Sequence, residues 1–515
     1  LYLHPYDATL YLWRARVHLE LGYADLAASD AYRALLLTDE ARDDSGEYHD
    51  EATEALADRQ AVGKDEVDAE LGPEAEQQDG DGAVYALLER CSRRAYTILV
   101  QSLTAVGCLA SAYDFHKQAV TTCASASDQR HLALLKDQIR GQARLKLGRS
   151  DELSDAELDD LRKSDRLSDH GTVRREIYPW NEHEPDRFSE RTLTALNAMM
   201  RTVAPKCEVR VTELPALKPM ATTKQEKARG KGYREGEEEE KEEEEGEEMP
   251  TITQLGLFAT EDIPGGEVVL REASVLTANN RLHESLCDAC STAFTFPSHD
   301  DMSSSQGGGP IPCPSCDDIF FCSPMCLERA QALYHPSVCG KEVETIGKEV
   351  SAQESPEALY LLLLARALAM SFTTDTHPLE LEAVKYIWGD FSNSLTSTSA
   401  STSSAPVSTL PFTYTHNINM PLHVLTKMDI NIWTTLELTD TWILNTLYAK
   451  FRGTASARLS TRAGDSRPEV CAVHPAWSLA NHSCAPNVMW EWGGEMCFVA
   501  RRNKLGRRMA RLRLR

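Results

Sequence analysis

Seven cysteines and one histidine between residues 287 and 339 are the side chains of this sequence best suited to chemistry. Thiolates and imidazoles are the ligands that zinc prefers, and spacings of two or three residues let two ligands of one turn face the same ion. Half of the chain's fourteen cysteines fall in this stretch, which argues against chance. They form four pairs: Cys287 and Cys290, Cys313 and Cys316, Cys322 and Cys326, and His335 and Cys339.

Four successive pairs of this kind usually interleave, so that the first pair shares an ion with the third and the second with the fourth. Disulfides are the alternative, but the rest of the chain is typical of an intracellular protein, in which thiols stay reduced. We therefore expect two zinc ions in this stretch. Interleaving assigns Cys287, Cys290, Cys322 and Cys326 to one ion, and Cys313, Cys316, His335 and Cys339 to the other.

Two short segments on either side of this row carry turn-forming and polar residues. In TQLGLFATEDIPGGEVVLREA we expect a β-hairpin, with strands at Leu255 to Ala259 and Val268 to Leu270 joined through Pro264 to Gly266. In LANHSCAPN, the polar residues Asn481 and His482 can offer amide and backbone groups to a ligand, or can simply satisfy one another within a turn. The motif alone leaves both interpretations open.

A second hairpin is expected directly after LANHSCAPN. Residues Val488 to Trp492 and Glu495 to Ala500 read as strands, with Gly493 and Gly494 as the turn.

The bulk composition excludes several classes of protein. The 515 residues are enough for two to four domains, and the hydrophobic fraction of 42% suffices for packed cores. A net charge of -25 disfavours binding to DNA or to an anionic membrane. No apolar run is long enough to span a membrane, and no secretory signal is visible. We expect a protein of the nucleus, the cytoplasm or both, without a direct nucleic-acid or membrane partner.

The first half of the chain is predicted to be helical. Within residues 1–149, the segments 8–39 and 96–119 place large, small and turn residues as in a 34-residue helix-turn-helix repeat, which resembles the tetratricopeptide repeat (TPR); an ordinary antiparallel helical pair is the alternative. The acidic stretch at about 40–82 is expected to be a disordered insert. Residues 150–223 form a connecting segment. Residues 224–250, first basic and then nearly all Glu, are expected to be a solvated, disordered linker.

The zinc row together with the two flanking motifs resembles the SET- and MYND-domain (SMYD-like) lysine methyltransferases, in which a MYND zinc module is inserted into a SET domain. The gaps of five residues from Cys316 to Cys322 and eight from Cys326 to His335 match MYND, and NHSCAPN matches the SET signature. With the TPR-like helices, the whole is similar to a fungal-type TPR–MYND–SET protein.

The resemblance implies an α+β multidomain fold, with a TPR-like helical region followed by a β-rich SET domain that carries the MYND module and a helical insert. Its expected boundaries are 251–286 for the first SET part, 287–339 for the MYND finger, 340–450 for the helical insert with a Ser/Thr-rich loop at 392–408, 451–503 for the second SET part and 504–515 for a basic tail.

The resemblance also implies a chemistry, the transfer of a methyl group from S-adenosyl-L-methionine to the side-chain amine of a lysine in a histone or another protein. Carried over residue by residue, the cofactor would be held by Gly256, Leu257, Asn481 and His482, while Cys484 would join later cysteines on a third zinc. Proline-rich peptides are implied as further partners, because MYND grooves in the family favour them.

The sequence departs from the family pattern in three places. Position 254 is Gln, where the first loop usually has a second glycine, and no tyrosine follows Tyr448 and no cysteine follows Cys497. The catalytic tyrosine therefore has no match, and we expect a chain that is cut at its end, as it is at a start that lacks Met. A protein-lysine methyltransferase that is inactive in this form is one hypothesis; a non-catalytic adaptor that binds proteins through its TPR and MYND modules is the alternative.

Overall fold

The computed structural model describes residues 1–62, 81–122, 126–174, 177–215, 251–280, 285–294, 309–316, 318–348, 354–389, 409–459 and 468–501. The linker predicted at 224–250, the Ser/Thr-rich loop at 392–408 and the basic tail at 504–515 lie outside these residues. The chain divides into two compact units. Unit 1 comprises Leu1–Glu184 and Ser274–His474, and unit 2 comprises Pro185–Ala273 and Pro475–Arg515.

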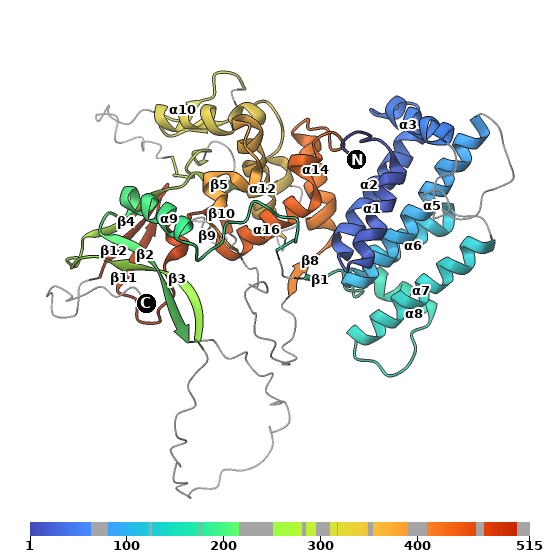
Figure 1. Cartoon of the computed structure of the whole chain (residues 1–515), viewed down its shortest axis with the longest axis horizontal. Coiled ribbons are helices and arrows are strands. Elements are labelled where there is room, and N and C mark those ends of the chain that lie inside the picture. Colours follow the sequence, from blue (N-terminus) through green and yellow to red (C-terminus); the bar gives the residue numbers. More distant parts are fainter. Residues whose placement is uncertain are drawn as a thin grey trace, which may run out of the picture. The chain divides into compact units, whose positions relative to one another are not determined.

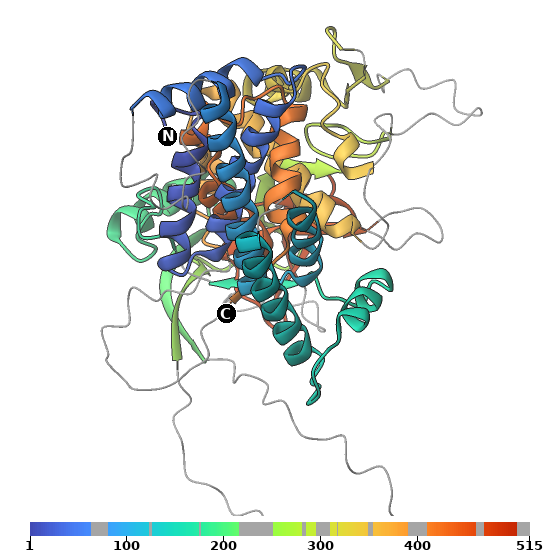
Figure 2. The ribbon, with the colours of Figure 1, turned by 90° about the vertical axis from the view of Figure 1, so that its right-hand side faces the viewer.

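Unit 1 begins with an array of helices, which Figure 1 shows in blue and cyan and Figure 2 shows side by side. The Asp7 side chain caps the first helix by accepting a hydrogen bond from the Thr9 amide. Gly22 (φ 84°) and Gly107 (φ 92°) provide the left-handed residues that end one helix before the next begins. The helices are α1 (Ala8–Glu20), α2 (Ala24–Arg42), α3 (His49–Val62), α5 (Asp81–Val106), α6 (Leu109–Thr122), α7 (Ala126–Lys146) and α8 (Asp155–Lys163).

The expectation of disorder at about 40–82 is wrong for its first part, because α3 lies there. Ala52 and Leu56, one helical turn apart, are both buried, and α3 packs against α2 and α5. Two apolar residues on one face were enough to anchor a helix that is otherwise acidic and polar. Residues 63–80 of the expected insert lie outside the described chain.

A second group of helices in unit 1 packs around α12 (Ser355–Thr374). By length and composition alone this helix could cross a membrane, but 67% of its most apolar window is buried inside the protein, as in the core helix of a soluble protein. It contacts strands β5 and β10 and helices α10, α14 and α16. The other helices are α10 (Pro324–Leu333), α11 (Thr345–Lys348), α13 (Glu382–Lys385), α14 (Met420–Lys427), α15 (Leu436–Thr439) and α16 (Thr441–Thr454).

Unit 1 also contains three small antiparallel sheets. Strand β10 (Pro468–Val473) lies between β5 (Leu276–Asn279) and β9 (Ser456–Leu459). The pairs β1 (Gly171–Arg174) with β8 (Thr409–Phe412), and β6 (Ile311–Pro312) with β7 (Phe320–Phe321), form the other two.

Ion pairs between half-buried Arg14 and two buried carboxylates join the two helical groups of unit 1. Arg14 on α1 lies 2.6 Å from a carboxylate oxygen of Asp30 on α2 and 2.6 Å from one of Asp440, the residue that caps α16. Burial alone would raise the pKa of Asp30, but Arg14 and His18 outweigh it and hold that pKa below its usual range. These ion pairs hold the N-terminal helices against the helices after residue 354, within one compact unit. The face of α2 that carries Asp30 is therefore covered by other parts of unit 1.

Unit 2 contains helix α9 (Glu190–Val203), the two-stranded sheet of β2 (Cys207–Pro215) and β3 (Thr251–Ala259), and a three-stranded sheet in the order β11-β12-β4. Figure 1 shows these last three strands as neighbouring arrows. The sheet is formed by β4 (Val268–Ala273), β11 (Val488–Trp492) and β12 (Glu495–Ala500).

One predicted hairpin is confirmed and the other is wrong. Strands β11 and β12 pair from Val488 and Ala500 onward, within the predicted bounds. Strand β3, in contrast, pairs with β2 along its whole length, and β4 pairs with β12, so the turn between β3 and β4 joins two different sheets. Strand β2 was not recognised in the connecting segment 150–223. Because β2 takes the edge of β3 along its whole length, the turn signal after β3 could not decide the pairing.

Candidate functional site

The first ligand set is assembled by one turn after β5 and by the start of α10. Cys287 and Cys290 form the turn, Cys322 follows β7, and Cys326 lies in the first turn of α10, where the Ser323 side chain accepts a hydrogen bond from its amide. The sulfur of Cys322 lies 3.6 Å from the sulfur of Cys290 and 3.6 Å from that of Cys326. All four ligand atoms lie within 4.8 Å of one another.

The second set surrounds the β6–β7 hairpin. Cys313 and Cys316 follow β6, and His335 and Cys339 follow α10. The sulfur of Cys313 lies 3.9 Å from that of Cys339, and the Nε2 atom of His335 lies 3.0 Å from the sulfur of Cys313. Burial lowers the pKa of His335, which favours the neutral imidazole that binds metals.

These distances fit tetrahedral metal sites. Zinc–sulfur bonds of about 2.3 Å at tetrahedral angles place two sulfurs about 3.8 Å apart, and the three sulfur–sulfur distances above straddle this value. The thiols of each set shift one another in both directions: burial and neighbouring cysteines raise the pKa of Cys322 and Cys339, whereas a hydrogen bond with Cys287 lowers the pKa of Cys326. Thiolates crowded in this way repel one another, so a divalent cation is the natural counter-charge for each set. Each set can therefore hold one metal ion.

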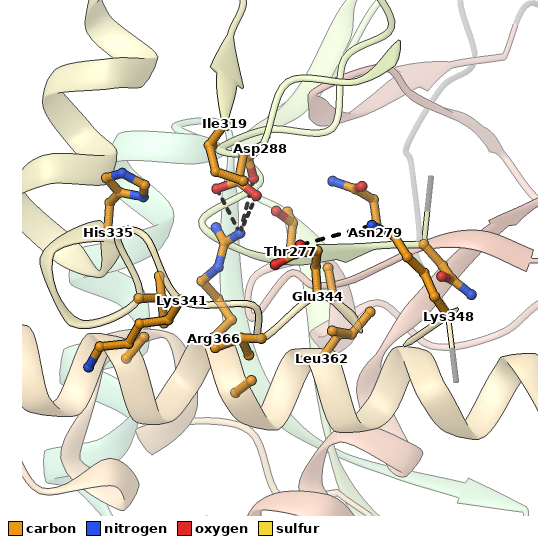
Figure 3. Close-up of a pocket in the computed structure, with 16 residues that line it drawn as sticks. Thr277, Asn279, Asp288, Ile319, His335, Lys341, Glu344, Lys348, Leu362 and Arg366 are labelled. Carbon is orange, nitrogen blue, oxygen red and sulfur yellow. Dashed lines mark hydrogen bonds and ion pairs between the residues drawn. The ribbon is translucent and has the colours of Figure 1, made fainter. Parts of the chain in front are cut away.

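A half-buried ion pair between Asp288 and Arg366, shown in Figure 3, lies beside both ligand sets. Asp288, inside the first cysteine pair, accepts hydrogen bonds from Arg366 of α12 at 3.0 Å and from the Tyr334 hydroxyl at 2.7 Å. Tyr334 precedes the ligand His335, and the Arg366 guanidinium lies 3.6 Å from the centre of its ring. One carboxylate thus connects the first ligand set, the approach to the second and α12.

Figure 3 also shows the small hollow of about 90 Å³ that Arg366 and Asp288 line together with Glu344 and Lys348. Lys348 lies 3.9 Å from Glu344, so these two charges pair with each other, as Arg366 and Asp288 do.

The other candidate site lies within unit 2, where the segment around Asn481 meets strand β3. The Asn481 side-chain amide donates a hydrogen bond of 3.3 Å to the Leu255 carbonyl. A Cβ atom on Gly256 would lie 2.9 Å from the Asn481 Nδ2 atom and 2.9 Å from a ring carbon of Phe258. Any residue other than glycine at position 256 would therefore push the Asn481 side chain away from the strand.

An open hollow of about 730 Å³ lies on this segment, within the volume range of ordinary ligand pockets. Asn481 and His482 supply polar groups to it, and Arg501 supplies a positive charge. Trp477, Pro486, Val488, Trp490 and Phe498 supply most of its apolar wall. A ligand with an extended body and charged or polar ends fits such a lining.

The four residues expected to hold a cofactor are all in unit 2, but they differ in exposure. Gly256 and Leu257 are buried in β3, Asn481 is half-buried and His482 is exposed. Leu257 is 1% exposed and pairs with Val209 of β2, so it lies inside the sheet and not on the hollow. Cys484, expected on a third zinc, is exposed, with its sulfur 3.6 Å from the His482 Nε2 atom.

The sequence reading missed two residues of this region. Leu255 provides the carbonyl that Asn481 contacts. Glu272 of β4 is buried, and its carboxylate accepts hydrogen bonds from the amides of Ala476 and Trp477, at 2.9 Å each. A Glu inside an apolar strand, VVLREA, was the available signal, because an unpaired buried carboxylate requires partners.

Comparison with known proteins agrees with these geometries. Residues 254–504 match the family model of the SET domain. No curated protein matches the chain. Residues 254–504 are thus a SET domain, and both Cys/His sets lie inside its limits, as expected of an inserted MYND module.

Proposed function

We propose that this protein is an S-adenosylmethionine-dependent protein-lysine N-methyltransferase of the SET–MYND type, acting on histones or other proteins. The observation that carries the proposal is the Asn481 side chain, held against Gly256 at the edge of a hollow of about 730 Å³ within a matched SET domain.

The residues of the hollow fit the cofactor. S-adenosylmethionine has an amino-acid end, an apolar middle and an adenine ring, and it supplies a methyl group on a positively charged sulfur. The Asn481 amide and His482, which line the hollow, would hold its polar end, while the aromatic wall of Trp477 and Phe498 suits a planar base. Gly256 and Leu257, also expected to hold the cofactor, do not line the hollow; Gly256 contributes by leaving room for Asn481.

Positioning is a large part of such a transfer, because the amine must approach the methyl group in line with the bond that breaks. The target lysine must also be neutral, although its ordinary pKa is about 10.4. A narrow apolar channel disfavours the ammonium form. Val488 and Phe498 of the hollow would contribute apolar surface to such an environment.

We assign the two Cys/His sets to two structural zinc ions. Each set is closed, with four protein ligands, and so leaves no coordination position for a substrate. Their contribution is to fold residues 287–339 and to keep a fixed surface for protein partners.

A second candidate function is that of a non-catalytic adaptor in the nucleus or cytoplasm. It is supported by Met325 on α10, which is 73% exposed beside the first ligand set and could contact a proline-rich peptide. The TPR-like helices would also bind protein partners. Part of their surface is already occupied, because Arg14, which pairs with Asp30, also contacts Asp440 at the start of α16.

Calorimetric titration of the purified chain with S-adenosylmethionine separates the two functions. We expect binding that Asn481→Ala weakens about tenfold, the value of one hydrogen bond to a charged group, at unchanged zinc content. Transfer of labelled methyl groups to histones or to total protein then tests catalysis. If the native chain bound zinc but no S-adenosylmethionine, the result would support the adaptor function and contradict the methyltransferase function.

A further inference from the structure

Glu272 is the most deeply buried carboxylate of unit 2 among the described residues, with 7% of its surface exposed. It lies on β4, opposite Met496 of β12. Its two oxygens accept separate main-chain hydrogen bonds, Oε1 from the Ala476 amide and Oε2 from the Trp477 amide, both at 2.9 Å. None of the side-chain cations in the described residues is bonded to it; the neighbouring Arg271 bonds to Glu495 on the exposed face of the sheet.

The two amides begin the short helical turn η6 (Trp477–Leu479). The first amides of a helical turn have no partner within it, so an outside acceptor fixes where the turn starts. Two residues after η6 ends, the chain reaches Asn481, which bonds to the Leu255 carbonyl. The segment is thus anchored at both ends, by Glu272 before the turn and by Asn481 after it.

The ionised form of Glu272 destabilises the fold, although it binds two amides. Burial raises its pKa to about 7, and the two main-chain bonds only partly oppose this; no charged group contributes to the shift. The residue opposite it on β12, Met496, and the two residues whose amides it binds, Ala476 and Trp477, have no titratable side chain. Because the folded state binds this proton more tightly than the unfolded state, the contribution of Glu272 to stability falls as pH rises from about 4.5 to about 7.

A group that destabilises the fold when it is ionised, yet holds two amides in that form, is better explained by function than by stability. We propose that Glu272 is a positioning residue, whose carboxylate fixes residues 476–477 so that Asn481 and His482 are presented to the cofactor. This inference rests on the proposed function. The carboxylate has two acceptors for two amides, whereas an uncharged amide side chain would have one.

The test compares Glu272→Gln with the native chain at pH 8. We expect the affinity for S-adenosylmethionine, measured by calorimetry, to fall about tenfold, because one amide loses its charged acceptor. The thermal midpoint should be unchanged or higher, because the buried charge is removed. The control is Glu495→Gln, the same substitution at a half-buried position of β12, which should alter neither quantity.

The pH dependence gives a second readout. Lowering the pH from 8 to 6 protonates Glu272 in the native chain, so the ratio of native to Glu272→Gln affinity should shrink toward one. The ratio is used because titration of the cofactor itself cancels from it. A ratio that is independent of pH, or close to one at pH 8, overturns the inference, and so does a fall in thermal midpoint that accompanies the loss of affinity.

Failure of the proposed function would look different, since the native chain would then bind no S-adenosylmethionine at any pH. Amide hydrogen exchange tests the anchor without the cofactor. At pH 8, Ala476 and Trp477 should exchange faster in Glu272→Gln than in the native chain and in Glu495→Gln. Equal exchange in all three proteins would refute the role of Glu272 as an anchor.

Discussion

The metal-binding region of unit 1 and the ligand segment of unit 2 are built in opposite ways. In the first, two closed sets of four ligands are supported by the buried contacts of Asp288, Arg366 and Tyr334. In the second, half-buried Asn481 makes one hydrogen bond of 3.3 Å, and His482 next to it is exposed. In the first region the ligands and the supporting charges contact one another, whereas the second leaves polar groups that a ligand can use.

The largest effect is expected from breaking a metal set. Cys313→Ser should reduce the zinc content from two ions to at most one for each chain, because a lost thiolate opens the tetrahedral set. Structural zinc contributes about 10–16 kcal/mol in isolated fingers, so the module should unfold locally. Elemental analysis of the purified protein measures the metal.

The matched control for this change is Cys497→Ser, a half-buried cysteine that belongs to neither set and should leave both ions in place. Two ions retained in Cys313→Ser would reject the ligand assignment.

The support of the metal sets should be the next most sensitive feature. Arg366→Met leaves Asp288 without its counter-charge in a mostly buried position, which should lower the free energy of unfolding by about 3 kcal/mol. Denaturant titration measures this loss. Arg271→Met, which removes an exposed ion pair with Glu495, should cost less than about 1 kcal/mol. Similar losses in the two variants would contradict a special role for the pair in Figure 3.

The ligand segment should respond in affinity more than in stability. Gly256→Ala places a methyl group 2.9 Å from the Asn481 Nδ2 atom, so the amide must move away from β3. We expect the affinity for S-adenosylmethionine to fall tenfold or more, with a stability loss of about 1–3 kcal/mol from overpacking.

Gly493→Ala is the control for this change, since a Cβ atom there meets nothing within 4 Å. If Gly256→Ala bound the cofactor as well as Gly493→Ala does, Asn481 would not be part of the cofactor site.

The smallest effect is expected at Leu257. Its side chain is 1% exposed and faces the core, so Leu257→Met should change stability by less than about 1.5 kcal/mol and leave the affinity unchanged. Calorimetry and thermal denaturation of the same sample measure both. A large loss of affinity would mean that the Leu257 side chain serves the ligand.

The same contrast explains how much the sequence could predict. The two ligand sets were predictable because spacing within one short stretch determines which thiols can share an ion, as at Cys287 and Cys290. The β11–β12 hairpin was also predictable, since its strands and turn are adjacent. The partner of β3 was not, because β2 lies on the other side of the linker, and the roles of Leu255 and Glu272 depend on contacts that no local pattern records.

The pairing of β4 with β12 affects how the protein folds during its synthesis. Ala273 lies opposite Glu495, so more than two hundred residues must be added before β4 finds its neighbour. At roughly 5–20 residues per second, the ribosome takes on the order of ten seconds or longer over this interval. Meanwhile the nascent strand has an open edge with the apolar side chains of Val269 and Leu270. The sheet of β4 and β12 can form only after all of unit 1 has been synthesised. We therefore expect β4 to bind chaperones during synthesis.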